Sequence, residues 1–293
     1  MWTEADIPDQ HGRVAVVTGG NTGIGYETAR ALADRGAAVL LACRNDERAA
    51  DAAARIGAAV PGAVVDTVRL DLGSLESVHA AAADVRRRHA RIDLLINNAG
   101  VTGLDGHTAD GIEIQFGINH IGHFALTAVL LDMLAPDARV VTVSSIGHRF
   151  GRFDATGKPC GTSPYADSKL ANLLFTYELD RRLRAAGVPV SALAAHPGGA
   201  STEVFRYSPP WFRIPNLAIA KAFGRTPALG ALPTLRAATD PTARGGEYYG
   251  PGGLFEIQGH PEPVTSSARS HDERLQAALW SVSEDLTSTR TSV

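Results

Sequence analysis

A tyrosine and a lysine lie four positions apart in the stretch "SPYADSKLAN", which begins at Ser163. If this stretch is helical, the side chains of Tyr165 and Lys169 share one face, one turn apart. Lysine is scarce in the chain, because only three of the 28 Lys+Arg residues are lysine. A phenol beside an ammonium group can act as a general acid or base, although an incidental helix contact would give the same spacing.

This chemistry would require a shifted tyrosine pKa. A free tyrosine has a pKa of about 10, so proton transfer near pH 7 needs a downward shift of about three units, or roughly 4 kcal/mol. An adjacent ammonium and the N-terminus of a helix both favour the phenolate. The sequence therefore predicts that Lys169 lowers the pKa of Tyr165.

A glycine-rich turn, "TGGNTGIG", follows the apolar run 13–18 and precedes a helical pattern. Gly19 can turn the chain out of the strand, Gly23 lets a pyrophosphate approach the backbone, and Gly25 brings the helix close to the sheet. Amide N–H groups at the start of that helix would face the anion. A purely structural turn is the alternative, but the position between a buried strand and a helix favours nucleotide binding.

The end of the second apolar run bears on which nucleotide would bind. That run ends in "LLACRN", with Arg44 at its end and no acid before Asp46. Enzymes that prefer NAD usually carry an acid here to hold the ribose 2′-hydroxyl. A guanidinium instead grips a 2′-phosphate bidentately, so the sequence predicts NADP(H) over NAD(H). A solvated surface role for Arg44 is the alternative.

Strand-like apolar runs alternate with helix-like patterns along the chain. The predicted strands span residues 13–18, 38–43, 64–70, 92–98, 138–145 and 190–196. The predicted helices span residues 25–36, 45–60, 74–90, 111–134, 163–187 and 267–286. Repeated strand–helix units are typical of a parallel sheet covered on both faces. The sequence thus predicts an α/β fold with one doubly wound (Rossmann) parallel sheet of about seven strands.

No break in composition divides the chain, so we interpret residues 1–293 as a single domain. Segment 201–226 interrupts the alternation with prolines and aromatic residues. We expect a substrate lid there, with an ordinary surface excursion as the alternative. We expect the polar tail, residues 287–293, to be frayed.

The composition excludes several classes of protein. A net charge of −3 gives no electrostatic reason to expect nucleic acid or a membrane surface as a partner. Cys43 and Cys160 are too few for a disulfide scaffold, so we expect a reducing, cytoplasmic location. The N-terminus is acidic and polar, unlike a signal peptide. The longest apolar segment, 124–134, contains Asp132 and is predicted to be too short to span a bilayer.

Polar residues at several strand ends would meet at one edge of such a sheet. The fourth strand runs into "NNAG", and the fifth ends in "VSS" at Ser145. Together with "TGGNTGIG" and "YADSK", these motifs resemble the short-chain dehydrogenase/reductase superfamily over residues 13–199. The stretches "LLACRN", "GINHIGHFALT" and "HPGGASTEV" are most similar to its retinol-dehydrogenase and protochlorophyllide-reductase-like branch.

The resemblance implies a catalytic tetrad of Asn119, Ser145, Tyr165 and Lys169. Tyr165 would give a proton to a substrate carbonyl oxygen, or take one from the alcohol, and Ser145 would hydrogen-bond the same oxygen. Lys169 would hold the nicotinamide ribose, and Asn119 would anchor a water that links Lys169 to solvent. Ser144 is the less favoured of the two adjacent serines.

The resemblance also implies cofactor contacts along the glycine turn and the strand ends. These contacts would come from Gly19, Asn21, Thr22, Gly23, Ile24, Gly25, Arg44, Asp71, Leu72, Asn98, Ala99, Gly100, Tyr165, Lys169, Pro197, Gly198 and Thr202. Thr18 and Asn97 would support the turn and the strand end. We expect no metal, because the nearby histidines lack a carboxylate or cysteine set and hydride transfer needs none.

These observations predict an NADP(H)-dependent oxidoreductase that interconverts a carbonyl and an alcohol on a small, apolar substrate. Trp211 and Phe212 in the expected lid favour an apolar substrate, and loop 147–161 is expected to rim the substrate mouth. A reductase of carbon–carbon double bonds and a catalytically idle NADP-binding regulator are the alternatives. The resemblance is compatible with a homo-oligomer.

Overall fold

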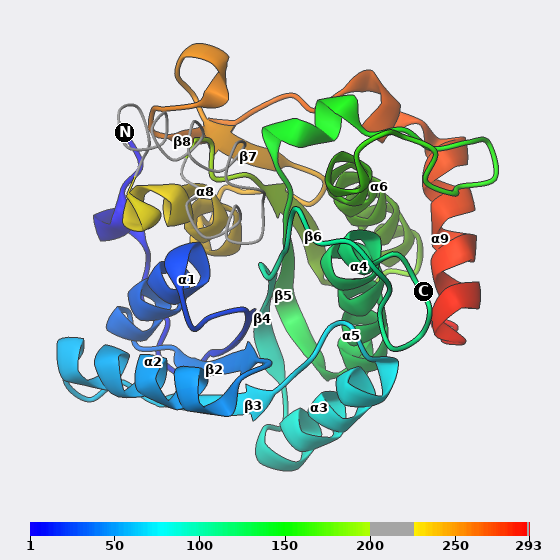
Figure 1. The fold of residues 1–293 in the computed structure, drawn as a ribbon. Helices are drawn as coiled ribbons and strands as arrows, with labels where there is room; N and C mark the ends of the chain where they lie inside the picture. Colours follow the sequence, from blue (N-terminus) through cyan, green and yellow to red (C-terminus); the bar gives the residue numbers. More distant parts are fainter. Residues whose placement is uncertain (200–225, 292) are drawn as a thin grey trace.

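The computed structural model describes residues 1–199, 226–291 and 293. Its centre is an eight-stranded sheet in the order β3-β2-β1-β4-β5-β6-β7-β8 (Figure 1). The strands are Val14–Thr18 (β1), Ala38–Cys43 (β2), Val65–Arg69 (β3), Ile92–Asn97 (β4), Leu134–Val143 (β5), Ser191–Ala195 (β6), Tyr248–Pro251 (β7) and Pro261–Pro263 (β8). The order places β1 beside β4, so the chain reverses its direction of travel across the sheet between β3 and β4.

Strands β1 to β7 run parallel to one another, which confirms the predicted doubly wound sheet. The eighth strand, β8, pairs antiparallel with β7 at the edge. The sequence did not predict β8, because "PEP" contains two prolines and gives no apolar run. Proline is tolerated there because an edge strand leaves one side unpaired.

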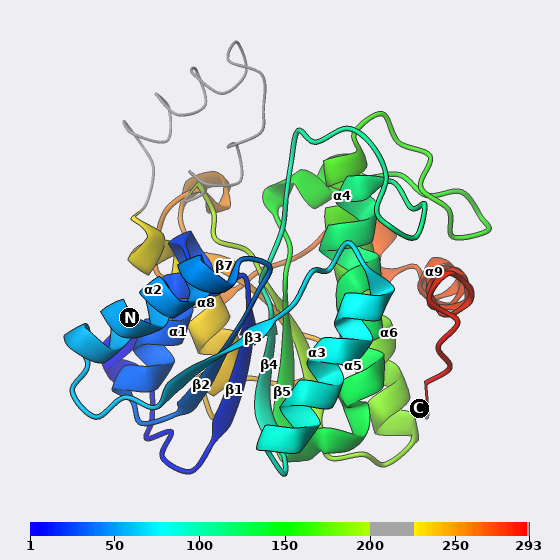
Figure 2. The same ribbon diagram turned by 60° about the horizontal axis from the view of Figure 1, so that its bottom comes forward.

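Helices cover both faces of the sheet (Figure 2). The helices are Gly23–Asp34 (α1), Asp46–Ala59 (α2), Leu75–Arg88 (α3), Ile114–Phe116 (α4), Gly122–Leu130 (α5), Pro164–Ala185 (α6), Pro227–Thr239 (α8) and Glu273–Thr287 (α9). Successive strand residues alternate between the faces. Val16 faces α3 and α5 in one cluster, whereas Val17 faces α1, α2 and α8 in the other. Both strand faces are therefore buried, as the continuous apolar runs predict.

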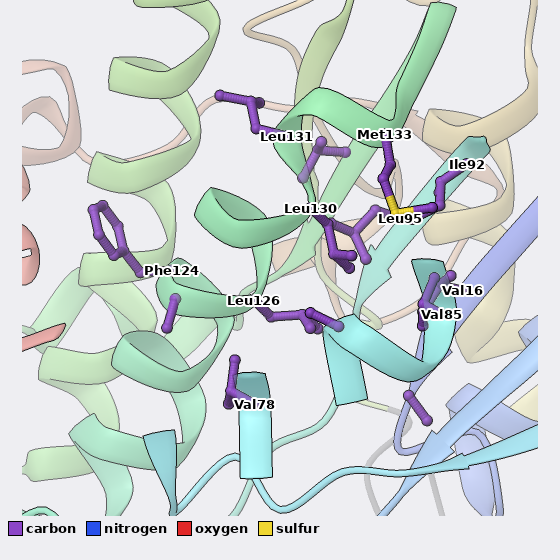
Figure 3. Packing of buried hydrophobic residues seen from close by; sticks show 14 of the residues in the cluster. Val16, Val78, Val85, Ile92, Leu95, Phe124, Leu126, Leu130, Leu131 and Met133 are labelled. Atoms are coloured by element: carbon purple, nitrogen blue, oxygen red, sulfur yellow. The ribbon is translucent and has the colours of Figure 1, made fainter. Parts of the chain in front are cut away.

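Figure 3 shows part of the first cluster. Val16 and Leu95 of the sheet lie with Val78 of α3 and with Phe124 and Leu126 of α5, and all five are nearly fully buried. These side chains come from segments far apart in the sequence. Their packing fixes α3 and α5 against the sheet, and so fixes the loops that join them to it.

The helix predicted over residues 111–134 contains one irregular turn. Between α4 and α5 the chain makes a π-helical turn, Gly117–Ile121, which carries Asn119. Such turns are often found at functional sites. The helical stretch Ile114–Met133 extends beyond the apolar segment 124–134 and could cross a membrane by length and composition alone, which corrects the expectation that this segment is too short. Within the structure, 83% of its most apolar window is buried as a core helix.

Loop 147–161 begins beside the predicted catalytic residues, since a methyl group on Gly147 would lie 3.4 Å from Ser145 Oγ and 3.5 Å from the Tyr165 ring, and its place at a substrate mouth stays a prediction. Phe153 and Pro159 pair as a short antiparallel bridge, so the loop forms a hairpin. A methyl group on Gly157 would lie 2.5 Å from backbone atoms of Ala278 and Leu279, which shows that the hairpin packs against α9. The loop therefore connects α6 with α9, since the Arg152 N–H donates to Asp167 in α6 at 2.8 Å. The predicted lid, apart from Thr226, lies outside the described residues, and so do Thr202, Trp211 and Phe212.

We predict that Trp280→Ala lowers the free energy of unfolding by about 3–5 kcal/mol. Trp280 is 2% exposed, its ring centroid lies 5.1 Å from that of Phe124, and the Arg182 guanidinium lies 4.5 Å from its centroid. Urea unfolding measures the change. Leu286→Ala on the same helix is the control, because Leu286 is 41% exposed and should cost less than about 0.5 kcal/mol. Equal losses would show that α9 is not held through Trp280.

Candidate active site

The glycine turn has the geometry that the sequence predicts. Gly19 leaves β1 with a positive φ of 65°, and Gly23 begins α1 with a φ of 59°. A methyl group on Gly25 would lie 2.4 Å from both the Asn98 side chain and the Gly19 carbonyl oxygen. Only glycine therefore lets the first turn of α1 approach the ends of β1 and β4, with its free N–H groups at the groove.

Thr18 joins this turn to the end of β4. Its hydroxyl oxygen accepts hydrogen bonds from the backbone N–H groups of Asn98 and Ala99 at 2.9 and 3.0 Å. The same oxygen lies 2.8 Å from Nε2 of His123, whose Nδ1 lies 3.0 Å from the Asn119 carbonyl. A carbonyl can only accept, so Nδ1 carries the proton and Nε2 accepts from Thr18. Burial lowers the pKa of His123 to about 4, which keeps the ring in this neutral form.

A groove at the carboxyl edge of the sheet collects nearly all the predicted cofactor residues. It is lined by Gly19, Asn21, Thr22, Gly23, Ile24, Gly25, Arg44, Asp71, Leu72, Asn98, Ala99, Gly100, Ser145, Tyr165, Lys169, Pro197 and Gly198. Asn119 lies behind the groove, and Thr202 lies outside the described residues. The position of the groove agrees with the rule that doubly wound sheets bind ligands beyond their strand ends, where the strand order reverses.

One end of the groove is positively charged. Arg44 and Arg48 both line it and both are exposed. The nearby acid, Asp46, is engaged elsewhere, because its carboxylate lies 2.9 Å from the Arg69 guanidinium. Arg48 was not predicted from the sequence. Its signal was its position four residues after Arg44, in the first turn of a predicted helix, where both side chains can reach one anion.

At the other end lie Ser145, Tyr165 and Lys169. Ser145 lies two residues after the end of β5, and its Oγ accepts a hydrogen bond from the Gly147 backbone N–H at 3.1 Å. Tyr165 is in the first turn of α6, which Ser163 caps. Burial raises the pKa of the Tyr165 phenol, and a hydrogen bond with Ser145 opposes the rise. The predicted downward shift is therefore wrong, because desolvation raises the pKa of Tyr165 by more than the hydrogen bond with Ser145 lowers it.

Lys169 is 4% exposed, and its Nζ donates to the carbonyl oxygen of Val143 at 3.0 Å. Burial lowers the pKa of Lys169 to about 8. Its Nζ lies 5.8 Å from the centre of the Tyr165 ring. The neighbouring Ser144 donates from its hydroxyl to the Lys169 backbone carbonyl at 2.8 Å, so it supports the helix while Ser145 lies beside the phenol.

The side chain of Asn119 makes three hydrogen bonds inside the protein. Its amide accepts from the Val101 N–H at 2.8 Å and donates to the Val101 carbonyl and the Ser168 hydroxyl at 2.9 Å each. A methyl group on Gly100 would lie 3.3 Å from Lys169 Nζ and 3.4 Å from Asn119 Oδ1. Asn119 thus fixes the strand-end loop, and Gly100 leaves a space that both polar atoms face.

In the part of the chain that the structure describes, no three His, Cys, Asp or Glu side chains converge as metal ligands. The four histidines near the motifs are engaged within the protein. Besides His123, the ring of His120 lies 3.0 Å from the Ser283 hydroxyl, and those of His148 and His196 accept backbone N–H groups.

The sheet order and the groove define a class of proteins, the α/β proteins that bind a dinucleotide across the carboxyl edge of a parallel sheet. The family model for short chain dehydrogenase matches residues 13–211. The chain belongs to the short-chain dehydrogenase family, in a retinol-dehydrogenase-like branch. Membership makes it an oxidoreductase that uses a nicotinamide cofactor. The residues present fit such a group, since the glycine cradle, the α1 N-terminus and the arginine pair suit a dinucleotide phosphate.

Similar proteins span almost the whole chain. It is 39% identical to retinol dehydrogenase 13 of Homo sapiens, over 97% of this chain and 86% of that protein. Among solved structures it is similar to an uncharacterized protein from Mycobacterium paratuberculosis, with 41% identity and a TM-score of 0.81 over 100% and 99% of the two chains. It is also similar to the RhlG/NADP active-site complex of Pseudomonas aeruginosa, with 26% identity and a TM-score of 0.65 over 82% and 94%.

We predict that Gly25→Ala weakens nicotinamide-cofactor binding at least about tenfold, or about 1.4 kcal/mol, because the methyl group displaces Asn98 or the Gly19 carbonyl. Fluorescence titration with the reduced cofactor measures the dissociation constant. Gly57→Ala in α2 is the matched control, since a methyl group there meets nothing within 4 Å. Unchanged binding in Gly25→Ala would contradict the assignment of this turn to the cofactor.

Proposed function

We propose that the protein is an NADP(H)-dependent oxidoreductase that interconverts a carbonyl and an alcohol, with Tyr165 as the general acid or base. One observation carries the proposal: the groove that fits a dinucleotide ends at Tyr165, Ser145 and Lys169. A proton donor, a hydroxyl hydrogen-bond partner and an ammonium group therefore lie together where the reactive end of the cofactor would be. A mere cofactor sensor would not need this set.

The roles of the three side chains follow from their environments. Because burial raises the pKa of Tyr165, the phenol holds its proton at neutral pH and can donate it to a carbonyl oxygen. Ser145, whose hydroxyl lies beside the phenol, would hydrogen-bond the same oxygen and orient it. Lys169, with a pKa of about 8, carries a charge at neutral pH and can hold ribose hydroxyls. Bound NADPH supplies the hydride, and NADP⁺ accepts it.

The preference for NADP(H) is supported by the charge at the far end of the groove. Arg44 and Arg48 line it, whereas Asp46 is paired with Arg69. Two guanidinium groups beside the N-terminus of α2 favour a 2′-phosphate through charge-assisted hydrogen bonds. Among the described lining residues the one carboxylate is Asp71, which already accepts from the Gly73 N–H at 2.9 Å, so the two arginines dominate the charge at this end.

The proposed substrate is small and apolar, and the protein is proposed to act in the cytoplasm without a nucleic-acid or membrane partner. Val101, Leu104 and Ile118 add apolar surface to the groove, and the similarity to a retinol dehydrogenase supports an apolar alcohol or carbonyl. The proposed lid, residues 201–226, lies almost wholly outside the described residues. A homo-oligomer is compatible with this function.

A turnover screen tests the proposed function. Retinoid, steroid, aliphatic and quinone carbonyls, and enones, are offered with NADPH, and NADPH loss and product structure are recorded. We predict reduction of at least one carbonyl to its alcohol, and a loss of about 10²-fold or more in kcat in Tyr165→Phe with cofactor affinity retained. No turnover, an unchanged rate in Tyr165→Phe, or reduction at the enone double bond alone would refute the proposal.

We predict that Arg44→Ala and Arg48→Ala each lower the ratio of kcat/KM for NADPH over NADH by about tenfold, and that the wild-type ratio exceeds one. The loss falls on NADPH, because only NADPH carries the phosphate. Arg55→Ala in α2 is the control, since this exposed arginine lies over the Tyr26 ring and does not line the groove. A wild-type ratio below one would exclude the NADP(H) preference.

A further inference from the structure

A buried histidine lies at the centre of the turn that carries Ser145. After β5 the chain passes through Ser145 into a short 3-10 helix, Ile146–Phe150. His148 lies in this turn and is 0% exposed, although it follows the reactive loop by three residues. Its ring packs edge-on against Tyr248, with the centroids 5.7 Å apart. The proposed chemistry gives this side chain no role.

Both ring nitrogens of His148 are engaged, each with a backbone group. Nδ1 lies 2.7 Å from the Ser145 carbonyl oxygen, and Nε2 accepts from the Ser267 N–H at 3.1 Å. A carbonyl can only accept and an amide N–H can only donate, so the two bonds specify one neutral tautomer with the proton on Nδ1. Burial lowers the pKa of His148 to about 4, which is consistent with that neutral state.

The orientation of the Ser145 hydroxyl depends on this peptide group. The Ser145 carbonyl accepts from His148 twice, from Nδ1 and from the backbone N–H at 3.0 Å. The Gly147 N–H, within the same turn, donates to Ser145 Oγ at 3.1 Å. The hydrogen bonds to the Ser145 carbonyl and to Ser145 Oγ thus hold one turn closed, and loss of the bond from His148 Nδ1 would loosen the turn whose Gly147 N–H holds the hydroxyl.

The next residue, Arg149, also connects this turn to the C-terminal part of the chain. Arg149 donates to the Glu256 carboxylate at 3.0 Å and to the Thr265 carbonyl at 2.8 Å. Glu256 lies in a left-handed conformation, with a φ of 57°, which is uncommon for a residue with a side chain. The segment from Glu256 to Ser267 therefore contacts the turn at two successive residues, and fixes it to the C-terminal part of the chain.

We propose that His148 is a positioning residue for Ser145, and that its Nδ1–H, anchored through Nε2 by Ser267, holds the Ser145 peptide so that the hydroxyl faces Tyr165. The inference rests on the proposed role of Ser145 in carbonyl reduction. It goes beyond that role, because the orientation of the Ser145 hydroxyl is attributed to the contact between His148 and Ser267, about 120 residues later in the chain.

Two substitutions separate the positioning role from a structural one. The amide of His148→Asn reaches the place of Nδ1 and keeps the bond to Ser145, whereas the amide of His148→Gln reaches the place of Nε2 and keeps the bond to Ser267. We expect Asn to retain most of kcat and Gln to lose about tenfold or more, as Ser145→Ala does, with the NADPH dissociation constant unchanged in both. Urea unfolding checks that both variants fold.

A second readout does not need turnover. Because the hydrogen bond from Ser145 lowers the pKa of Tyr165, we expect His148→Gln to raise that pKa as Ser145→Ala does, and His148→Asn to leave it unchanged. NMR of tyrosine labelled with ¹³C at the ring carbon that bears the hydroxyl, assigned with Tyr165→Phe, follows the titration. Equal values in the Asn and Gln variants would overturn the positioning role, whereas a Gln-specific shift in a protein without turnover would refute only the proposed reaction.

Discussion

The parallel register of the sheet is the constraint on which the rest of the site depends. Thr18 pairs with Ala42 in β2, and Val143 pairs with Ala195 in β6, so these strands end at one level. The glycine turn, Arg44, Ser145 and the segment after β6 follow directly from those ends. Residues from four distant parts of the chain therefore meet at one edge without any dedicated binding domain.

Buried polar bonds then give this edge its shape. Thr18 links the glycine turn to the end of β4, His123 links Thr18 to the turn that carries Asn119, and Lys169 is held by Val143. Each such bond adds only about 0.5–1.5 kcal/mol, but a buried group that loses its partner costs about 1–3 kcal/mol. The bonds therefore specify one arrangement of the loops more strongly than they stabilise the fold.

Local patterns were sufficient for the first six strands, most of the covering helices and most residues of the groove, but not for β7, β8, α8 or Arg48. Gly25 could be predicted because a helix that starts at a strand end needs a glycine to approach it, and Ser145 and Tyr165 because they follow strand and cap signals. The pKa of Tyr165, the place of Asn119 and the docking of the 147–161 hairpin on α9 could not. They depend on burial and on contacts across the chain, which the spacing of residues does not encode.

The proposed reaction is direct hydride transfer between a cofactor in the groove and a carbonyl carbon beside Tyr165. Isotope transfer tests it most directly: the protein is given a carbonyl substrate and NADPH with deuterium in both positions at nicotinamide C4, and the alcohol is analysed by mass spectrometry and NMR. We predict one deuterium on the former carbonyl carbon. Alcohol without deuterium on that carbon would contradict the claim.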